Sequence, residues 1–304
     1  MPTNTTTDRL DILKTYKLFI DGKFPRSESG RTTTILNSKG QPLAYTSRAS
    51  RKDLREAVES ARRAQATWAS STAYLRAQII YRIAEMLEGR RAELIESIHS
   101  VAAPIAKSAK KSKSSGKSLT PAAEVAFSID RLVHYAGWAD KFSQVLGCNN
   151  PVAGPHYNFT VPEPTGVVAV IAPDQPPLLG LVSLLAPVIC SGNATVLISS
   201  QTNPLPAVLL GEILATSDVP AGVVNILTGD HAELIPFIAG HRDIDAVHGA
   251  ASGDSATTLR AGSAENIKRV VIRDSIEYTS SECESAWWIE PFVEMKTIWH
   301  PASA

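Results

Sequence analysis

The chain has 304 residues, of which 44% are hydrophobic, so it can build one large domain or two ordinary ones. Its 30 basic and 30 acidic side chains give a formal charge of zero, which argues against nucleic acid or a membrane surface as a partner. Cys148, Cys190 and Cys283 are too few and too widely spaced for a disulfide framework or a metal site. The polar first residues and the short, interrupted apolar runs predict a cytoplasmic protein without a membrane span.

The first elements are predicted to form a small sheet and then helices. Residues 16–20 are typical of a strand, and the turn dipeptide Asp21-Gly22 predicts a hairpin that returns along 32–36. Apolar residues at helical spacing then follow a capping box made by Ser50 and Asp53.

Two further helices are predicted in the first half of the chain. The apolar stripes predict one over 73–98 and another over 121–145. Residues 107–117, between them, contain no apolar side chain except alanine, so burial cannot offset the entropy of ordering them. We expect a mobile loop over 107–120. The alternative is a docking site for an acidic partner or a phosphate backbone, although the absence of aromatic residues disfavours nucleic acid.

The second half alternates β-rich runs with segments of helix length. Residues 157–161 alternate polar and apolar side chains, as a half-exposed strand does. The later runs are 166–172, 194–200, 222–228, 246–249 and 269–272, with helix-length segments at 178–190 and 207–217. This alternation predicts an α/β fold, with a doubly wound, Rossmann-like parallel sheet and a ligand crevice at the carboxyl ends of its strands.

Several segments resemble the aldehyde dehydrogenase superfamily in order and spacing. They are Phe19-Ile-Asp-Gly-Lys23, Tyr135-Ala-Gly-Trp-Ala-Asp-Lys141, Glu163-Pro-Thr-Gly-Val-Val168, Leu184-Leu-Ala-Pro187 with Ser191-Gly-Asn193, and Pro220-Ala-Gly-Val-Val-Asn-Ile-Leu-Thr-Gly229. The likeness extends to about Val271 and resumes in 292–298, which is similar to the closing strand of the family. A full member carries roughly 150–200 further residues between these points, about one domain.

This resemblance implies a domain organisation. Residues 1–274 would form the NAD(P)-binding-type domain, with an oligomerisation strand over 156–162 as a small β extension. Residues 275–289 would be a short remnant in place of the catalytic domain, and 290–304 a closing oligomerisation strand.

The family oxidises an aldehyde through a cysteine adduct, passes hydride to NAD(P), and hydrolyses the thioester with a glutamate base. By the resemblance, the nucleophile belongs to the absent domain, and no cysteine here has its Gly-Gln-x-Cys setting. The glutamates beside Cys283 raise the pKa of its thiol, which predicts an ordinary surface or partly buried residue. Cys190, in an apolar helix, and Cys148, in a loop, are predicted to be inert.

Two catalytic positions of the family carry other residues. Arg273 stands where the general-base glutamate is expected, and a protonated guanidinium cannot accept a proton. Gln175 takes the place of the asparagine that stabilises the oxyanion, and its extra methylene displaces the amide donor. The resemblance therefore implies no catalytic residue in this chain.

The cofactor positions also differ from the family pattern. Ile198 and Gln201 replace the lysine and glutamate that hold the adenosine ribose. The turn that receives the pyrophosphate keeps Gly249 but ends in Asp254, whose carboxylate opposes a diphosphate. Gly229, together with the helix after Pro173, keeps part of the crevice geometry. We expect no cofactor, or NAD or NADP if this degenerate pocket is functional.

The leading hypothesis is a catalytically inactive subunit. It would be a structural or regulatory partner of a full-length, active aldehyde dehydrogenase. The layout resembles the truncated second half of the two-part, family-sixteen enzymes, which also lacks the nucleophile, and this resemblance implies such a partner. Strands near Tyr157, Phe159 and Lys296 would join that partner, or another copy, by β-augmentation. The alternative for these strands is pairing within the chain only.

Two other functions remain open from the sequence. One is a binding module that holds a nucleotide or another small ligand in the crevice. The other is an enzyme, either with an active site completed by a partner or with an unrelated reaction at His248, Asp254 or Glu277. His248, at a strand end, is more often a structural residue than a catalyst.

Overall fold

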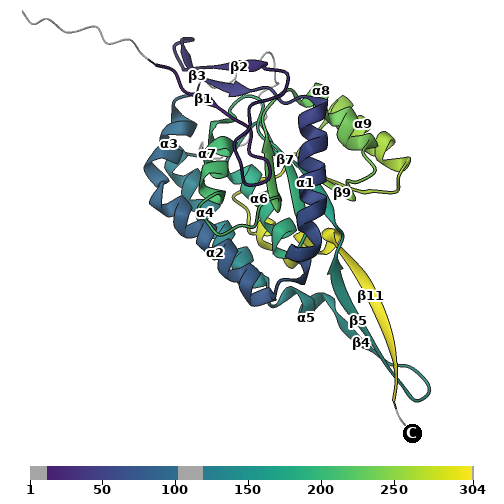
Figure 1. Cartoon of the computed structure of the whole chain (residues 1–304). Helices are drawn as coiled ribbons and strands as arrows, with labels where there is room; N and C mark the ends of the chain where they lie inside the picture. The colour runs from purple at the N-terminus through teal and green to yellow at the C-terminus, as the bar shows by residue number, and fades with distance from the viewer. Residues whose placement is uncertain (1–11, 102–118, 303–304) are drawn as a thin grey trace, which may run out of the picture.

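The computed structural model describes residues 12–101 and 119–302. Figure 1 shows a central parallel sheet covered by helices, a small sheet near the N-terminus, and a narrow arm of three strands that leaves the body. The predicted mobile loop over 107–120 lies outside the described residues, apart from its last two positions. Within the described ranges, every helix is too short or too polar to cross a membrane.

The N-terminal sheet consists of β1 (Thr15–Tyr16), β2 (Thr32–Leu36) and β3 (Pro42–Ser47). Its order is β1-β3-β2, with β2 antiparallel and β1 parallel to β3. The predicted hairpin between 16–20 and β2 is therefore wrong, because the sequence pattern missed β3. A nearer partner in the chain, joined to β2 by a short turn, takes the pairing.

The predicted turn at Asp21-Gly22 does form, but it serves a different pairing. Both residues have positive φ, 56° and 68°, and Ile20 and Lys23 exchange backbone hydrogen bonds across them. Phe19, just before the turn, forms an antiparallel bridge with Ile226 of the central sheet. The N-terminal segment therefore closes one edge of the central sheet.

The predicted helices form, with two interruptions. The capping box is confirmed, since the Asp53 backbone N–H donates to Ser50 Oγ and the Ser50 N–H to the Asp53 carboxylate, at 3.3 and 2.7 Å. The helices are α1 (Arg51–Ser70), α2 (Ala73–Gly89), α3 (Arg91–His99), α4 (Pro121–Trp138) and α5 (Phe142–Leu146). The helix predicted over 73–98 is thus divided at Arg90, which follows a glycine and leaves the helical conformation. The helix predicted over 121–145 ends at Trp138.

The central sheet has the order β10-β9-β6-β7-β8, and all its strands are parallel. Its strands are β6 (Val167–Ile171), β7 (Ala194–Ile198), β8 (Val224–Leu227), β9 (Ala246–Gly249) and β10 (Arg269–Ile272). The connecting helices are α6 (Leu179–Cys190), α7 (Leu205–Leu214), α8 (His231–Gly240) and α9 (Gly253–Ala264). The prediction of an α/β, doubly wound parallel sheet is confirmed.

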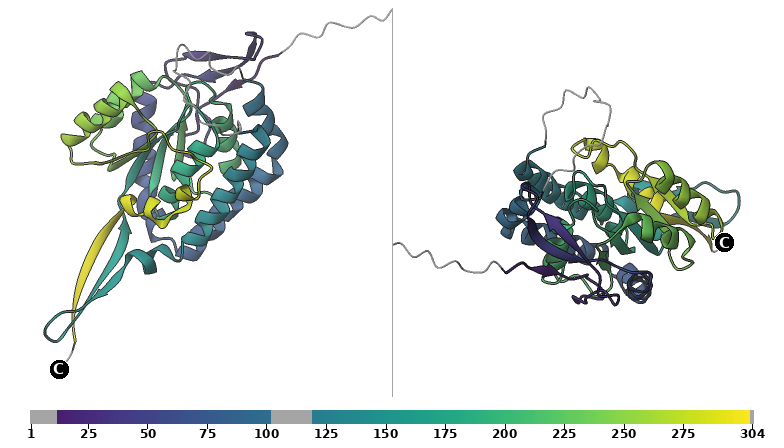
Figure 2. Two further views of the ribbon diagram at one scale, coloured as in Figure 1. Left: turned by 180° about the vertical axis from the view of Figure 1, so that it is seen from behind. Right: turned by 90° about the horizontal axis from the view of Figure 1, so that it is seen from above.

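Alternate residues of the buried strands enter two separate cores. In β6, Val168 and Val170 pack towards α6, α7, α2 and α4, whereas Val167, Ala169 and Ile171 pack towards α1, α8 and α9. Helices therefore cover both faces of the sheet, as the views in Figure 2 show. This is why the strands are apolar throughout rather than alternating.

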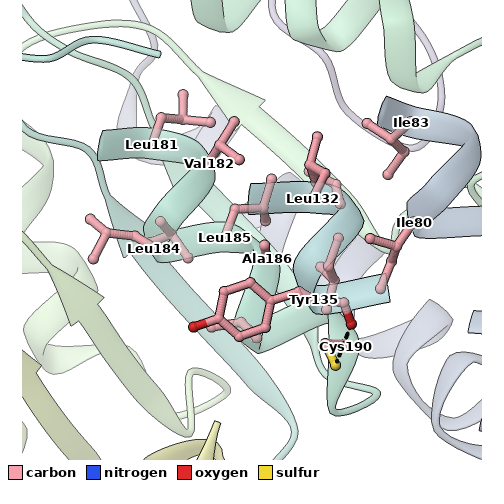
Figure 3. Packing of buried hydrophobic residues seen from close by; sticks show 14 of the residues in the cluster. Ile80, Ile83, Leu132, Tyr135, Leu181, Val182, Leu184, Leu185, Ala186 and Cys190 are labelled. Carbon is pink, nitrogen blue, oxygen red and sulfur yellow. Dashed lines mark hydrogen bonds between the residues drawn. The ribbon is translucent and has the colours of Figure 1, made fainter. Parts of the chain in front are cut away.

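Helix α6 is buried on every side. Figure 3 shows its leucines and valines packed against α4 and α2, with Leu132 and Ile83 among the facing residues. A fully buried leucine of this kind stabilises the fold by about 1.5–3 kcal/mol. At the end of α6, the Cys190 thiol donates to the Tyr135 backbone carbonyl at 3.3 Å.

The arm is a three-stranded antiparallel sheet with the order β11-β5-β4. Its strands are β4 (Cys148–Asn150), β5 (His156–Pro164) and β11 (Val293–Pro301). The predicted strand over 156–162 extends to Pro164, and the predicted closing strand over 290–304 begins only at Val293. Cys148 was expected in a loop, but it opens β4, which pairs with Thr160 and its neighbours.

Residues 273–292 connect β10 to β11 and lie at the base of the arm (Figure 2). We call them the closing segment. They contain three short 3-10 helices, η1 (Ser281–Glu284), η2 (Ala286–Trp288) and η3 (Glu290–Phe292). Their buried side chains belong to the same core as α4 and α6.

Candidate functional site

The carboxyl ends of the five parallel strands meet at one edge of the central sheet, where open α/β sheets bind their ligands. Most predicted pocket positions follow these strand ends. Ile198 and Gly249 are the last residues of β7 and β9, while Pro173, Gly229 and Arg273 follow β6, β8 and β10 within two residues. The fold therefore brings these positions to a common edge.

Two small hollows open along this edge. One, of about 140 Å³, includes Gln201 and Gly229 and borders the N-terminal sheet. The other, of about 290 Å³, includes Pro173, Gln175 and Arg273 and borders the closing segment. Both volumes are smaller than the roughly 300–1,000 Å³ that is typical of small-molecule binding sites.

The two positions that would hold the nucleoside ribose, Ile198 and Gln201, differ from the family pattern in their chemistry. Ile198 is fully buried in the core and has no polar side-chain atom. Gln201 is already used, because its Oε1 accepts the His231 backbone N–H at 3.0 Å where α8 begins. The ring of His231 in turn contacts the Ser199 carbonyl through Nε2 at 2.7 Å. These two positions therefore offer the ribose only the amide donors of Gln201, without the carboxylate acceptor and the cationic donor of the family pattern.

Asp174 was missed by the sequence reasoning, although it lies between two predicted positions. Its carboxylate Oδ1 accepts the backbone N–H groups of Gln201 and Thr202, at 2.9 and 3.1 Å. This ties the loop after β6 to the loop after β7 and narrows the opening between these strands. An aspartate three residues after a buried parallel strand, in the loop at its carboxyl end, is the sequence signal that would have identified it.

The turn at the start of α9 is also unfavourable for a diphosphate. Ser252, the N-cap residue, makes no side-chain capping bond, and α9 begins at Gly253. Asp254 lies exposed in the first helical turn, where its negative charge takes the favourable position at the helix N-terminus that a phosphate would occupy. Taken with the ribose positions, these residues do not fit NAD or NADP.

The Arg273 side chain contacts the rings of Trp288 and His248. Its guanidinium carbon lies 4.2 Å from the ring centroid of Trp288, and its Nε donates to His248 Nε2 at 3.3 Å. Burial lowers the pKa of the guanidinium, yet an arginine remains protonated at neutral pH. Gln175, the other predicted replacement, is exposed and lines the same hollow without approaching a nucleophile.

His248 has the structural role that the sequence favoured. Its Nδ1 donates to the Leu184 carbonyl at 2.9 Å while Nε2 accepts from Arg273, an arrangement that assigns the neutral tautomer. Complete burial, assisted by the charge of Arg273, lowers the pKa of His248 to about 3. Both ring nitrogens are thus occupied, and the prediction of a satisfied structural histidine is confirmed.

Cys283 was expected at the surface or partly buried, and this is wrong. Its exposed fraction is zero, because the η1 turn directs the thiol into the core, 3.7 Å from the Glu277 carbonyl. Burial is the main cause that raises the pKa of this thiol, and the adjacent Glu282 adds to it, while Arg131 acts in the opposite direction. A buried, protonated thiol is a poor nucleophile.

The thiols of the other two cysteines each donate one hydrogen bond to an oxygen acceptor. Cys190 is fully buried and donates to the Tyr135 carbonyl, and burial raises its pKa to about 12 (Figure 3). Cys148 is exposed on the arm, where its thiol donates to Asn150 Oδ1 at 3.1 Å. Within residues 12–101 and 119–302, no group of three or more histidine, cysteine or carboxylate side chains is arranged to hold a metal ion.

Hydrogen bonds from the body hold the closing segment in place. Arg131 Nη2 donates to the Tyr278 carbonyl at 2.9 Å, and the Tyr135 hydroxyl donates to the Cys283 carbonyl at 2.8 Å. The Asn193 amide donates to the Phe292 carbonyl at 2.9 Å. The sequence reasoning missed Arg131, which is fully buried on α4; its signal is a charged residue within an apolar helical stripe.

This sheet, with helices on both faces, defines an α/β protein of the doubly wound class. The model of the aldehyde dehydrogenase family matches residues 24–273. The chain therefore belongs to the aldehyde dehydrogenase family.

The relatives that this chain matches are about twice as long as the matched region. It is 31% identical over 277 residues to an aldehyde dehydrogenase of Aspergillus niger, which covers 89% of this chain and 52% of that protein. It is 32% identical over 269 residues to retinal dehydrogenase 2 of Gallus gallus, covering 86% of this chain and 48% of that protein. The chain thus spans about half the length of these relatives.

A solved structure of the family also matches this chain over about half of its own length. The NAD+ complex of aldehyde dehydrogenase from Bacillus cereus is 28% identical, with a TM-score of 0.75 over 85% of this chain and 50% of that one. The shared part is an α/β fold with a parallel sheet and covering helices.

Proposed function

We propose that this chain is a catalytically inactive aldehyde dehydrogenase subunit, which acts as a structural or regulatory partner of a full-length, active member of the family. Its counterpart is the non-catalytic second half of the family-sixteen enzymes, which the layout resembles. The observation that carries this proposal is the closing segment. In this chain it joins β10 directly to β11 and packs into the core, where a full member would continue into a catalytic domain.

The groups on the crevice edge support inactivity. Arg273, in the place of the general base, is a cation stacked on Trp288. Cys283, in the closing segment, is buried and has a raised pKa. Ile198 and Gln201 do not fit the cofactor ribose, so hydride would have no acceptor at this edge. Loss of any single group could be compensated, but here nucleophile, base and cofactor site are lacking together.

The arm supports a role in assembly. β11 is an outer strand of its sheet, and an outer strand presents unpaired backbone groups to another chain. Large side chains of the arm are exposed on both faces of its sheet, Tyr157 of β5 on one face and Met295 and Trp299 of β11 on the other. Phe159 and Lys296 lie near the middle of the paired β5 and β11 strands. A partner strand that adds to β11 would continue the sheet, and its side chains would pack beside Met295 and Trp299.

The activity test uses the purified chain with NAD or NADP and a panel of aliphatic and aromatic aldehydes. We expect no formation of NADH or NADPH above a blank without protein. A Cys283→Ser variant is the control for contaminating dehydrogenases. Turnover by the wild type that disappears in this variant would refute the proposal.

The assembly test uses a tagged version of this chain, expressed together with a full-length aldehyde dehydrogenase from the same source. We expect the two to elute as one complex in size-exclusion chromatography. A chain that stays strictly monomeric with every full-length family member of its source would refute the partner role, whatever the activity test shows.

The crevice supports a second candidate function, a binding module for a small ligand. The hollow of about 290 Å³ lies at the carboxyl ends of β6, β9 and β10, with Arg273 on its wall. Isothermal titration with NAD, NADP and acyl-CoA tests it. Heat that follows a saturable isotherm would favour this function, and the absence of heat at millimolar ligand would dismiss it.

A further inference from the structure

Helix α1 contacts helix α8 beside the central sheet (Figure 1). A charged groove is lined by the start of α1, by residues along α8 and by the loop that follows α8. Two adjoining hollows of about 430 and 680 Å³ form it and share three of their residues. We call it the α1–α8 groove. Its charged and apolar lining residues are Glu28, Arg51, Lys52, Leu54, Arg55, Glu233, Pro236, Phe237, Arg242 and Asp243. It is separate from the crevice edge, because it shares no residue with either hollow there.

We propose that the α1–α8 groove binds an acidic peptide segment of a partner protein. The cations carry the first part of the case. Among the described residues, Arg51, Lys52 and Arg242 have no carboxylate within 4.0 Å, and Arg55 has only Glu59 at 3.7 Å. Such cations are free to pair with carboxylates from another chain.

The carboxylates of the groove do not cancel these cations. Glu233 is held by two arginines outside the groove, Arg31 at 2.6 Å and Arg48 at 2.9 Å. Arg55 likewise pairs with Glu59 outside the groove, so Glu28 and Asp243 remain against Arg51, Lys52 and Arg242. The groove is therefore locally basic on a chain whose formal net charge is zero.

The position of the cations is unfavourable for the helix itself. Arg51 and Lys52 are the first two residues of α1, where the helix dipole already concentrates positive charge. The backbone N–H groups there are capped by Ser50 and Asp53, so the side chains rather than the helix end are available to a ligand. An anionic side chain from a partner would relieve this local repulsion.

The floor of the groove favours a peptide over a nucleic acid. Phe237 lines both hollows, with the Arg51 guanidinium 4.9 Å from its ring centroid, and Leu54 and Pro236 line the smaller one. This surface suits an apolar side chain. Glu28 and Asp243 would repel a continuous phosphate backbone, whereas a peptide can place neutral residues against them.

This docking surface goes beyond the proposed subunit role, because it is distinct from the arm. Two separated contacts to the same partner would raise the overall affinity through effective concentration. The arm supplies backbone pairing, and the groove supplies charge recognition.

The experiment measures the anisotropy of a fluorescein-labelled peptide in which glutamates flank a single phenylalanine, titrated with the full chain. We expect saturable binding at about 0.1 M salt and its loss at about 1 M, as the Debye length falls from about 10 to about 3 Å. Neutralising the groove with Arg51→Gln, Lys52→Gln and Arg242→Gln together should weaken binding by about tenfold or more. Phe237→Ala should weaken it less, through loss of the apolar contact.

The matched control removes the same charge elsewhere, with Arg82→Gln, Arg91→Gln and Arg260→Gln, and should bind as the wild type does. Unfolding midpoints check that each variant folds, and Arg242→Gln alone, in the loop after α8, replaces a triple variant that does not. The proposal is overturned if the wild type does not bind, if the control loses as much affinity as the groove variant, or if a DNA oligonucleotide of equal charge displaces the peptide equally well.

Discussion

The closing segment leads directly into β11 of the arm, yet most of its large apolar side chains are buried, whereas several of those on the arm are exposed. In the closing segment, Trp288 and Phe292 are 2% and 0% exposed. In the arm, Tyr157 and Trp299 are 62% and 60% exposed. The change occurs at Val293, the first residue of β11. The body thus buries these two aromatic rings beside the crevice, whereas the arm exposes its own, and the exposed rings support the proposed role in assembly.

Hydrogen bonding follows the same division. The carbonyls of the closing segment are bonded to buried side chains of the body, such as Arg131 and Asn193. The side chains of the arm bond mainly to one another, as Thr160 does to Thr297 and Lys296 to Glu163, at 2.9 and 2.8 Å. We therefore expect the closing segment to contribute more than the arm to the global stability of the body.

The largest expected effect tests this coupling with two neighbouring tryptophans. Trp288→Ala should lower the free energy of unfolding by about 3–5 kcal/mol, because it removes a buried aromatic ring and leaves a cavity beside Arg273 and His248. Trp287→Ala should change it by less than about 0.5 kcal/mol, because that ring is 65% exposed. Urea unfolding of both variants measures the difference. Equal losses would mean that the closing segment is not part of the folded core.

The second effect is a pH dependence that arises from His248. The pKa of this buried ring is about 3, compared with about 6.5 in an unfolded chain. Between these values the unfolded state takes up a proton that the folded state does not, so stability falls as the pH decreases. The slope approaches about 1.4 kcal/mol per pH unit.

Unfolding at a series of pH values between about 6.5 and about 4 reveals this slope. In His248→Asn the contribution should vanish, whereas His300→Asn, at the exposed end of β11, should keep it. A slope that is unchanged in His248→Asn would show that other groups cause the acid sensitivity.

The buried frame of the molecule was predictable from the sequence because its signals are local. The apolar runs at β9 and β10 match the observed strands residue for residue, and the capping box at Ser50 fixed the start of α1. Two long helices were predicted without their breaks, at Arg90 and after Trp138, because apolar periodicity continues across both. β3 was missed for a different reason. It forms by pairing with β2 and β1, and its own residues do not show a strand pattern that the sequence reasoning recognised.

The positions of the candidate-site residues were predictable from the sequence, but their hydrogen-bond partners were not. Arg273, Ile198 and Gln201 lie at the strand ends, as the βαβ pattern required. That Gln201 caps α8 and that Asp174 binds the neighbouring loop depend on distances across the sheet, which no linear pattern contains. The burial of Cys283 likewise follows from the way η1 turns, whereas its flanking glutamates suggested an exposed position.

A third effect tests whether the crevice can be restored by a single change. Arg273→Glu supplies the carboxylate of the family but places it against the face of Trp288 and the lone pair of His248. We expect a loss of about 1–3 kcal/mol in stability and still no NADH from aldehyde. Arg273→Lys, which keeps the charge, should lose less. Aldehyde turnover by Arg273→Glu would show that the crevice retains a usable nucleophile and cofactor site.

The smallest effect on stability, and the most specific for function, is expected in the arm. Trp299→Ala should change the free energy of unfolding by less than about 0.5 kcal/mol, because its ring is exposed and contacts His156 at the strand edge. The same substitution should weaken the complex with a full-length aldehyde dehydrogenase by about tenfold or more, since aromatic residues at the centre of an interface carry much of its energy. Tyr74→Ala is the control, because Tyr74 is 70% exposed but lies on α2 of the body. Association that survives Trp299→Ala and is lost in Tyr74→Ala would place the interface on the helical body and overturn the role of the arm.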